Sequence, residues 1–258
     1  MSDAYFTRLG DGRYLPTELA SGAWNPGEIH FSPVGGLIVH ELALHRADGD
    51  DKQLARVSFD ILGFLALEEC EVRVETVRPG RTIELVEATV TIAGRRAALA
   101  RAWYISPTDT ARSAGGAPPA LAAPDTLEQR PVMHEWSGGW VNSLEIRPIG
   151  TPLPGRTTAW LHTDYALVDG EESAPEAAYI ALIDTANGIA VRESPDHWLF
   201  PNLDLTIHLY RTPVAGWVGL DTTVTFGPTG LGLTSSALHD TLGPVGRAEQ
   251  ILTVRPPA

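Results

Sequence analysis

A run of apolar residues between positions 171 and 188 constrains the fold more than any other part of the chain. Ser173 and Glu176 have the spacing of a capping box, and Pro175 falls in the first turn, where its missing N–H costs nothing. The predicted helix is then apolar around nearly its whole circumference, through Ala177, Ala178, Ile180, Ala181, Leu182 and Ile183. Such a helix is normally enclosed by the rest of its domain. We therefore predict a central helix that fills a curled sheet.

Asp184 follows this apolar run directly. A carboxylate at the end of a buried helix must find hydrogen-bond partners, reach a cavity or change its pKa. One interpretation is that Asp184 touches substrate. The other is that it bonds to the backbone of residues 185–188, where a helix could end. The sequence pattern alone leaves both open.

The composition limits the class of protein. A chain of 258 residues with 43% hydrophobic content is long enough for two domains with real cores. We expect no membrane helix, because no apolar run approaches the roughly 20 residues that one needs, and no signal peptide at the start. The single cysteine, Cys70, excludes an internal disulfide and suits a cytoplasmic location. A net charge of −13 argues against nucleic acid or an anionic membrane as the partner.

Each half of the chain shows one helix followed by antiparallel strands. In the first half, Ser32 caps a predicted helix that runs to His45 with Pro33 at its first position, and the strands follow at 53–67, 71–77, 82–92 and 97–105. Residues 106–131 are rich in Ala, Pro, Gly, Thr and Ser and indicate an exposed linker. In the second half, a strand at 157–165 precedes the apolar helix, and strands follow at 202–211, 217–226, 231–239 and 247–254.

The two halves also match each other in sequence. Residues 57–59 align with 205–207 and residues 100–102 with 248–250, both at an offset of 148 residues. A repeat of this length indicates a duplicated domain. Two such sheets would pair edge to edge, which hides edge strands that otherwise invite aggregation.

The second half carries motifs of a known family, in residues 198–211, 217–221, 227–232 and 246–250, and Arg78-Pro79-Gly80-Arg81 adds a matching strand turn in the first. The chain thereby resembles a double-hotdog acyl-CoA thioesterase of the thioesterase II type. The resemblance implies an α+β fold, a tandem hotdog in which each half curls an antiparallel sheet around a central helix. It divides the chain into an N-terminal hotdog domain (1–105), a linker (106–131) and a C-terminal hotdog domain (132–258).

The resemblance also implies a function and a site. It implies hydrolysis of a fatty acyl-CoA thioester to free acid and coenzyme A, a role in lipid metabolism, and a homo-oligomer. The family's catalytic Asp falls on Asp184 and its Gln on Gln250. The family's hydroxyl residue falls on Asn202, or on Thr206 if the register slips, so this chain departs from the usual triad if Asn202 takes that place.

The chemistry is consistent with these residue types. Thioester hydrolysis needs a base that takes a proton from water and donors that face the carbonyl oxygen as it becomes anionic. Asp184 could be the base, and the amides of Asn202 and Gln250 could orient the water or donate to the oxyanion. An apolar surrounding would raise the pKa of Asp184 and amide donors would lower it, and the sequence leaves the balance open.

Alternatives remain. One is a non-catalytic acyl-CoA or lipid-binding protein; another is a hotdog dehydratase, which would need His208 or His239 beside Asp184. Glu41 and His40 lie where the first half could hold an equivalent site, although a solvated face or a dimer contact is the better interpretation for Glu41. Arg211, Arg247 and Arg81 could meet the phosphates of coenzyme A. We expect no metal ion and no cofactor, because no His-Glu-x-x-His, serine-hydrolase elbow or dinucleotide loop occurs.

Overall fold

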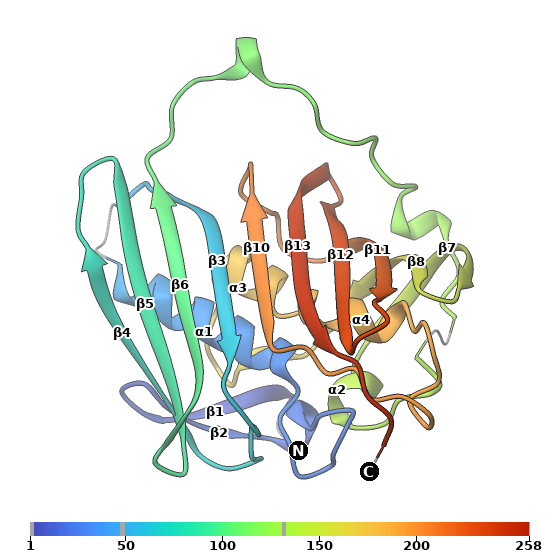
Figure 1. Cartoon of the computed structure of the whole chain (residues 1–258). Coiled ribbons are helices and arrows are strands. Elements are labelled where there is room, and N and C mark those ends of the chain that lie inside the picture. Colours follow the sequence, from blue (N-terminus) through green and yellow to red (C-terminus); the bar gives the residue numbers. More distant parts are fainter. Residues whose placement is uncertain (1–2, 47–49, 131–132, 258) are drawn as a thin grey trace.

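The computed structural model describes residues 3–46, 50–130 and 133–257, and in these residues a single sheet of 13 strands curls around the helices (Figure 1). The strand order is β7-β8-β11-β12-β13-β10-β3-β6-β5-β4-β2-β1-β9. The strands are β1 (Ala4–Gly10), β2 (Arg13–Pro16), β3 (Gln53–Ile61), β4 (Cys70–Arg78), β5 (Ile83–Ile92), β6 (Arg95–Ile105), β7 (Glu145–Leu153), β8 (Arg156–His162), β9 (Ala166–Val168), β10 (Asp204–Leu209), β11 (Val218–Phe226), β12 (Leu231–Asp240) and β13 (Gly243–Thr253). The α-helices are α1 (Phe31–His45), α2 (Gly139–Asn142), α3 (Pro175–Ile180) and α4 (Ala186–Ile189), and the 3-10 turns are η1 (Glu18–Ala20), η2 (Ala111–Ser113), η3 (Pro124–Thr126) and η4 (Ile183–Thr185).

The two halves join through antiparallel pairing of β3 with β10. Ser58 lies directly opposite Thr206, and Phe59 opposite Leu205. Ser58 and Thr206 are also the residues that the repeat matches to each other, so the halves are related by a pseudo-twofold axis through this pair. The predicted edge-to-edge pairing and the predicted tandem hotdog are both confirmed.

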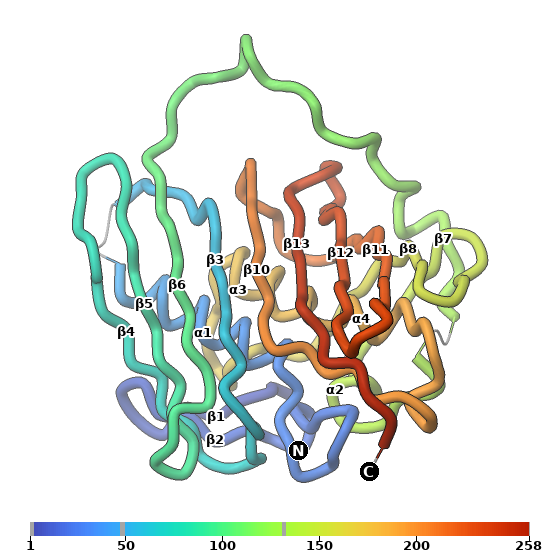
Figure 2. The backbone as a smooth tube through the Cα atoms, in the orientation of Figure 1, coloured from blue at the N-terminus to red at the C-terminus, as the bar shows by residue number. Residues whose placement is uncertain are grey.

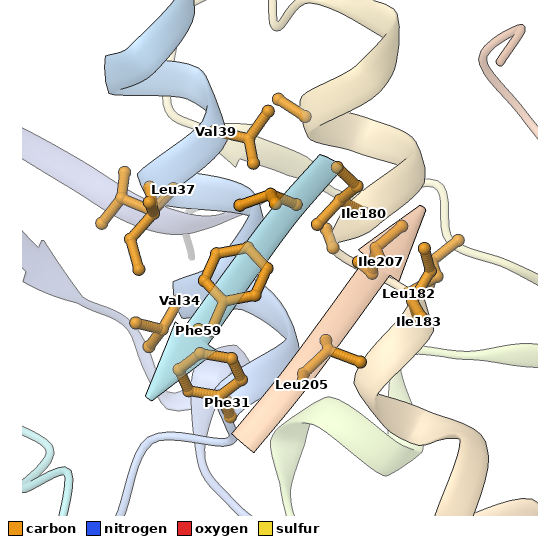
Figure 3. Close-up of a cluster of buried hydrophobic side chains, with 14 of the residues drawn as sticks. Phe31, Val34, Leu37, Val39, Phe59, Ile180, Leu182, Ile183, Leu205 and Ile207 are labelled. Carbon is orange, nitrogen blue, oxygen red and sulfur yellow. The ribbon is translucent and has the colours of Figure 1, made fainter. Parts of the chain in front are cut away.

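The helices fill the concave side of the sheet, as the apolar run predicts. Side chains of α1 and α3 interleave with those of β3 and β10, where Phe31, Val34, Phe59, Ile180, Leu205 and Ile207 are all buried (Figure 3). The two helices meet at Gly36, where an added Cβ would lie 2.6 Å from the Cβ of Ala181. This contact brings the helix backbones together and leaves no gap between them at that point.

The N-terminal hairpin extends the sheet beyond β4. β1 and β2 are joined by a turn at Asp11 and Gly12, and Gly12 takes φ +66, which a glycine adopts without strain. β2 pairs with β4, and β1 pairs in parallel with β9 of the second half. The hairpin therefore connects the outer edge of the first half to the second half underneath α1.

The segment after β6 crosses the outside of the molecule before the second half begins. Figure 2 shows it as an arch between β6 and η3, and nearly all of residues 106–123 are exposed. The division at 106–131 stays a prediction, and residues 131–132 at its end lie outside the described residues.

Several local expectations were wrong. Helix α1 starts at Phe31 and is capped by His30, whose Nδ1 accepts the Ser32 N–H at 3.1 Å, so Ser32 is not the cap. The capping box at Ser173 does not form: Ala174 is the N-cap of α3, and in the described residues the buried Ser173 Oγ has no hydrogen-bond partner. The strand expected at 53–67 ends at Ile61. Strand β7 was not predicted, because Pro148, Gly150 and Pro152 conceal a strand at the sheet edge.

Candidate active site

Asp184 lies at a break in the apolar helix. The predicted single helix is instead α3, a turn at residues 181–182, the 3-10 turn η4 and the short α4. The whole stretch from Tyr179 to Ala190 is buried, and Asp184 is only 4% exposed. The break gives the carboxylate a direction that a straight helix would not.

Two amides hold the Asp184 carboxylate. Asn202 Nδ2 donates to Oδ1 at 2.7 Å, and Gln250 Nε2 donates to the same oxygen at 2.8 Å. The other oxygen, Oδ2, receives neither amide. Asn202 also donates to the Asp204 carbonyl at 3.1 Å, so both of its N–H groups are used. The amides therefore orient Asp184 and leave Oδ2 for another partner.

Gln250 belongs to this site because of the pleat of β13. Ala248, Gln250 and Leu252 point to the concave side, and Gln250 is 1% exposed. Its Oε1 is buried and has no hydrogen-bond partner among the described residues, and neither does the hydroxyl of Thr234, which lies opposite Gln250 on β12. Unpaired buried acceptors are costly and are normally satisfied by water or ligand.

Thr206, the alternative hydroxyl residue, lies on the other face of the sheet. It pairs with Glu249 and Ser58, whose side chains share the outer face, whereas its neighbours Leu205 and Ile207 are buried. A one-residue shift of register reverses the face of a strand residue. The structure brings Asn202 to Asp184 and does not bring Thr206.

Burial dominates the acidity of Asp184. Loss of solvent raises its pKa from 3.8 to about 7, and the hydrogen bonds from Asn202 and Gln250 oppose this rise. The question that the sequence left open is therefore answered in favour of burial. A carboxylate with a pKa near neutrality is well matched to general base catalysis.

His30 is the residue that the sequence reasoning missed. Its Nδ1 lies 3.9 Å from Asp184 Oδ2, too far for a direct hydrogen bond, and burial lowers the pKa of the ring to about 3. Because Nδ1 accepts the Ser32 N–H, the neutral ring carries its proton on Nε2. His30 is therefore a neutral ring whose acceptor nitrogen, Nδ1, lies nearest the carboxylate and whose N–H is on Nε2. Its place as the cap of α1 could have suggested a buried position, but nothing in the sequence pairs it with Asp184.

A buried hydrogen-bond chain fixes His30 relative to Asp184. Thr185, the residue after Asp184, contacts the Ser32 hydroxyl at 3.2 Å and accepts from Trp140 Nε1 at 3.2 Å. The Trp140 ring stacks on His30 with centroids 5.6 Å apart. The start of α1, η4 and α2 are thereby held as one unit around the site.

Asp184 opens into a small cavity that leads to a wider surface groove. The cavity has a volume of about 70 Å³, and its lining includes His30, Asp184, Asn187 and Asn202. The groove has a volume of about 520 Å³ and includes the exposed side chains of Phe64 and Leu203. The two spaces share five lining residues: Trp24, Glu28, Ile61, Pro201 and Asn202. A small ligand group can thus reach the carboxylate from the surface.

The first half does not repeat this site. Counted from the first residue of α1 and of α3, Asp184 corresponds to His40, and the offset of 148 matches Gln250 to Ala102. His40 Nε2 contacts Glu171 at 3.0 Å, and Arg8 donates to Glu171 at 2.5 Å and to Glu41 at 3.0 Å. Tyr14 also donates to Glu41. Glu41 is thus part of an ion-pair cluster, with its side chain only 13% exposed, so the interpretation as a solvated residue was wrong. A dimer contact at Glu41 stays a prediction.

The arginines suggested for coenzyme A lie away from the cavity. Arg211 pairs with Asp240 at the far end of β10, and Arg247 points to the outer face beside Ser235 and Glu249. Arg81 lies in the β4–β5 turn. The groove beside the site includes a different arginine, Arg255.

The two histidines suggested for a dehydratase lie away from Asp184. Of the histidines in the described residues, only His30 comes within 4.0 Å of the Asp184 carboxylate, so His208 and His239 do not form the pair that a dehydratase would need. No three potential metal ligands gather anywhere in the residues that the structure describes. Within the same residues, no helix has the length and apolar character to cross a membrane.

Family models match both halves of the chain. The model for the acyl-CoA thioesterase C-terminal domain matches residues 124–254, and the model for the acyl-CoA thioesterase N-terminal domain matches residues 20–105. The N-terminal hairpin lies outside both matches. No curated protein matches the sequence.

Solved structures show the same fold at low identity. A protein from Novosphingobium aromaticivorans, assigned as a thioesterase, is 22% identical over 97% of this chain and 98% of its own, with a TM-score of 0.72. A hotdog-fold protein of unknown function from Alicyclobacillus acidocaldarius is 12% identical over 100% of this chain and 97% of its own, with a TM-score of 0.77. An acyl-CoA thioesterase II from Mycobacterium marinum is 17% identical over 99% of this chain and 96% of its own, with a TM-score of 0.68.

Proposed function

Because this chain belongs to the acyl-CoA thioesterase family, we propose that it hydrolyses an acyl-CoA thioester to the free acid and coenzyme A, with Asp184 as the general base. The observation that supports this most is the buried Asp184 carboxylate, which has one oxygen held by two amides and the other facing a cavity open to a groove.

The steps follow from this geometry. A water molecule in the cavity donates to Asp184 Oδ2, and Asp184 takes its proton as the water oxygen attacks the thioester carbon. The C–S bond then breaks, and the proton passes to the sulfur of the departing coenzyme A. Asn202 and Gln250 are positioning residues, because their N–H groups are already used. Each donates to Asp184 Oδ1, and the second donor goes to the Asp204 carbonyl from Asn202 and to the Asp184 carbonyl from Gln250.

The developing oxyanion needs a donor that the amides no longer supply. His30 Nε2–H fits this role, because the ring is neutral, lines the cavity and makes no hydrogen bond from Nε2 to any residue that the structure describes. One such donor contributes about 10²–10³ in rate. The role as oxyanion donor therefore moves from the amides to His30.

A non-catalytic acyl-CoA-binding protein would not require this arrangement. A carboxylate whose pKa is raised to about 7 opposes folding at neutral pH. A residue that costs folding free energy in this way is typical of functional sites. The Asp184–Asn202–Gln250 arrangement thus favours chemistry over binding alone.

The proximity of His30 to Asp184 gives the dehydratase alternative its one supporting observation. A dehydratase would need the imidazole as a base. The Ser32 N–H occupies the Nδ1 lone pair and leaves the proton on Nε2, so the ring offers no free lone pair to the cavity. Hydrolysis is therefore the better supported reaction.

The test is release of free thiol from acyl-CoA by the wild-type chain and by the Asp184→Asn variant. We expect release by the wild type and a loss of about 10²–10⁴ in the variant. Asp60→Asn is the matched control, since Asp60 is an exposed carboxylate on the outer side of β3. Binding of acyl-CoA without thiol release would refute the proposal, and hydration of an enoyl-CoA would favour the dehydratase. A cytoplasmic location, a role in lipid metabolism and a homo-oligomer stay predictions.

A further inference from the structure

The space beside Asp184 is too small for a long acyl chain. Its volume of about 70 Å³ is about half that of a cavity of roughly 150 Å³ that holds a benzene ring. Its apolar lining includes Ala23, Ile29, Phe31 and Leu65, together with three residues that also line the groove: Trp24, Ile61 and Pro201. Ile29, Phe31 and Leu65 are buried and belong to the core.

The routes by which the cavity could extend inward are closed. Between the helices, Gly36 meets Ala181, and a Cβ on Gly36 would also lie 3.1 Å from the Ala177 carbonyl oxygen. Between α1 and the sheet, Phe31 packs edge-on against Phe59 with ring centroids 5.5 Å apart, and Figure 3 shows the two rings next to each other among other buried side chains. These contacts oppose the extension of an acyl chain between the helices and the sheet.

The third side is closed by aromatic rings. Trp24 packs against Phe200 with centroids 5.2 Å apart and against Trp136 with centroids 4.7 Å apart. The Trp136 indole is fixed in place by a hydrogen bond of 3.0 Å to the Gly188 carbonyl. This hydrogen bond ties the wall to α4, the short helix that follows Asp184.

The groove is the larger of the two spaces and lies on the surface. It has a volume of about 520 Å³ and lies beside the cavity, because Trp24, Ile61 and Asn202 line both spaces. A thioester has two arms on either side of its carbonyl carbon. If the carbonyl is at Asp184, the cavity can take only the small arm and the groove must take the long one.

We infer that the substrate is a short-chain acyl thioester, whose acyl group of about two to four carbons occupies the cavity while the thiol arm lies along the groove. This inference rests on the proposed function and narrows it from fatty acyl groups to short ones. Leu65 is then a specificity-determining residue, because it closes the cavity without touching Asp184.

The test compares kcat/KM for acetyl-, butyryl-, octanoyl- and palmitoyl-CoA by thiol release. We expect kcat/KM for acetyl- or butyryl-CoA to exceed kcat/KM for palmitoyl-CoA by about tenfold or more. Leu65→Ala should raise kcat/KM for octanoyl-CoA relative to that for butyryl-CoA. Ala23→Leu fills the cavity from the other side and should lower kcat/KM for butyryl-CoA relative to that for acetyl-CoA. Leu233→Ala is the matched control on the outer face of β12 and should leave the ranking unchanged.

The outcomes separate the two proposals. A wild-type preference for palmitoyl-CoA overturns the short-chain inference and leaves the proposed hydrolase standing. The short-chain inference is also overturned if neither cavity variant changes the ranking of the substrates while circular dichroism shows both variants to be folded. Absence of thiol release from all four substrates overturns the proposed function, and the short-chain inference with it.

Discussion

Asp184→Asn should make the protein more stable and less active, and the gain in stability should depend on pH. The folded chain keeps a proton on Asp184 up to a pKa of about 7, whereas the unfolded chain releases it near the ordinary value of 3.8. Between these two values the folded state binds the extra proton, so its stability falls as the pH rises. Below about pH 4 the penalty is absent, and above about pH 7 it is complete.

The magnitude follows from the pKa. One pKa unit corresponds to about 1.4 kcal/mol, so a carboxyl whose pKa rises from 3.8 to about 7 opposes folding by roughly 4 kcal/mol at alkaline pH. Asp184 is 4% exposed, so solvent screening does not reduce this value much. Asparagine has nearly the same shape, and its Oδ1 can still accept from Asn202 and Gln250. The variant should therefore recover most of the penalty.

The assay is thermal unfolding of both proteins at about pH 5 and about pH 8.5. For a chain of this size each kcal/mol changes Tm by about 2–4 °C, so the variant should unfold roughly 10 °C higher at the alkaline pH and at a more similar temperature at the acidic one. Asp60→Asn should show no such pH-dependent difference. A Tm gain that is equal at both pH values, or a variant that is less stable at about pH 8.5, would refute the assignment of Asp184 as a buried, strained carboxyl.

Three further predictions concern neighbouring groups. Gln250→Leu removes one donor to Asp184 and should raise the pKa of that carboxyl further. The rise of kcat/KM with pH, which is centred near 7 in the wild type, should therefore move to higher pH. An unchanged pH profile would contradict the role of Gln250. His30→Phe keeps a ring against Trp140 but removes Nε2–H, and kcat should fall about 10²–10³ with little change in acyl-CoA binding by calorimetry; full activity would exclude His30 as the oxyanion donor. Arg8→Ala leaves Glu171 and Glu41 without their cation and should lower the free energy of unfolding by about 1–3 kcal/mol in urea, with kcat unchanged, whereas Arg73→Ala at an exposed pair should have almost no effect.

The sequence predicted the main features of the fold because their signals are local or repeated. The apolar stretch after Pro175 indicated a buried helix, and burial from Tyr179 to Ala190 confirms that. The offset of 148 residues predicted two halves paired at their edges, and β3 and β10 meet at its matched residues, Ser58 and Thr206. Such patterns express periodicity and duplication, which survive without any knowledge of distant contacts.

Details that depend on competing local signals were harder to predict. Ser173 and Glu176 fit a capping box, yet the backbone places Ala174 at the cap, because Pro175 fixes where the helix starts. Strand β7 was concealed by prolines that an edge strand tolerates. The break at residues 181–182 gave no strong signal in so apolar a run.

What the sequence determined by itself is therefore the tandem fold, the buried helix and the identity of a carboxylate that had to be explained. The family resemblance placed Gln250 and either Asn202 or Thr206 beside that carboxylate, and the tertiary structure decided for Asn202 and added His30. Asn202 and Gln250 reach Asp184 across 18 and 66 residues, and His30 comes from the other half of the chain. The pleat of β10 turned Thr206 outward, and burial, which is a property of the whole packed core, raised the pKa of Asp184. A site of this kind is built from long-range contacts, and these exist only once the sheet has closed around its helices.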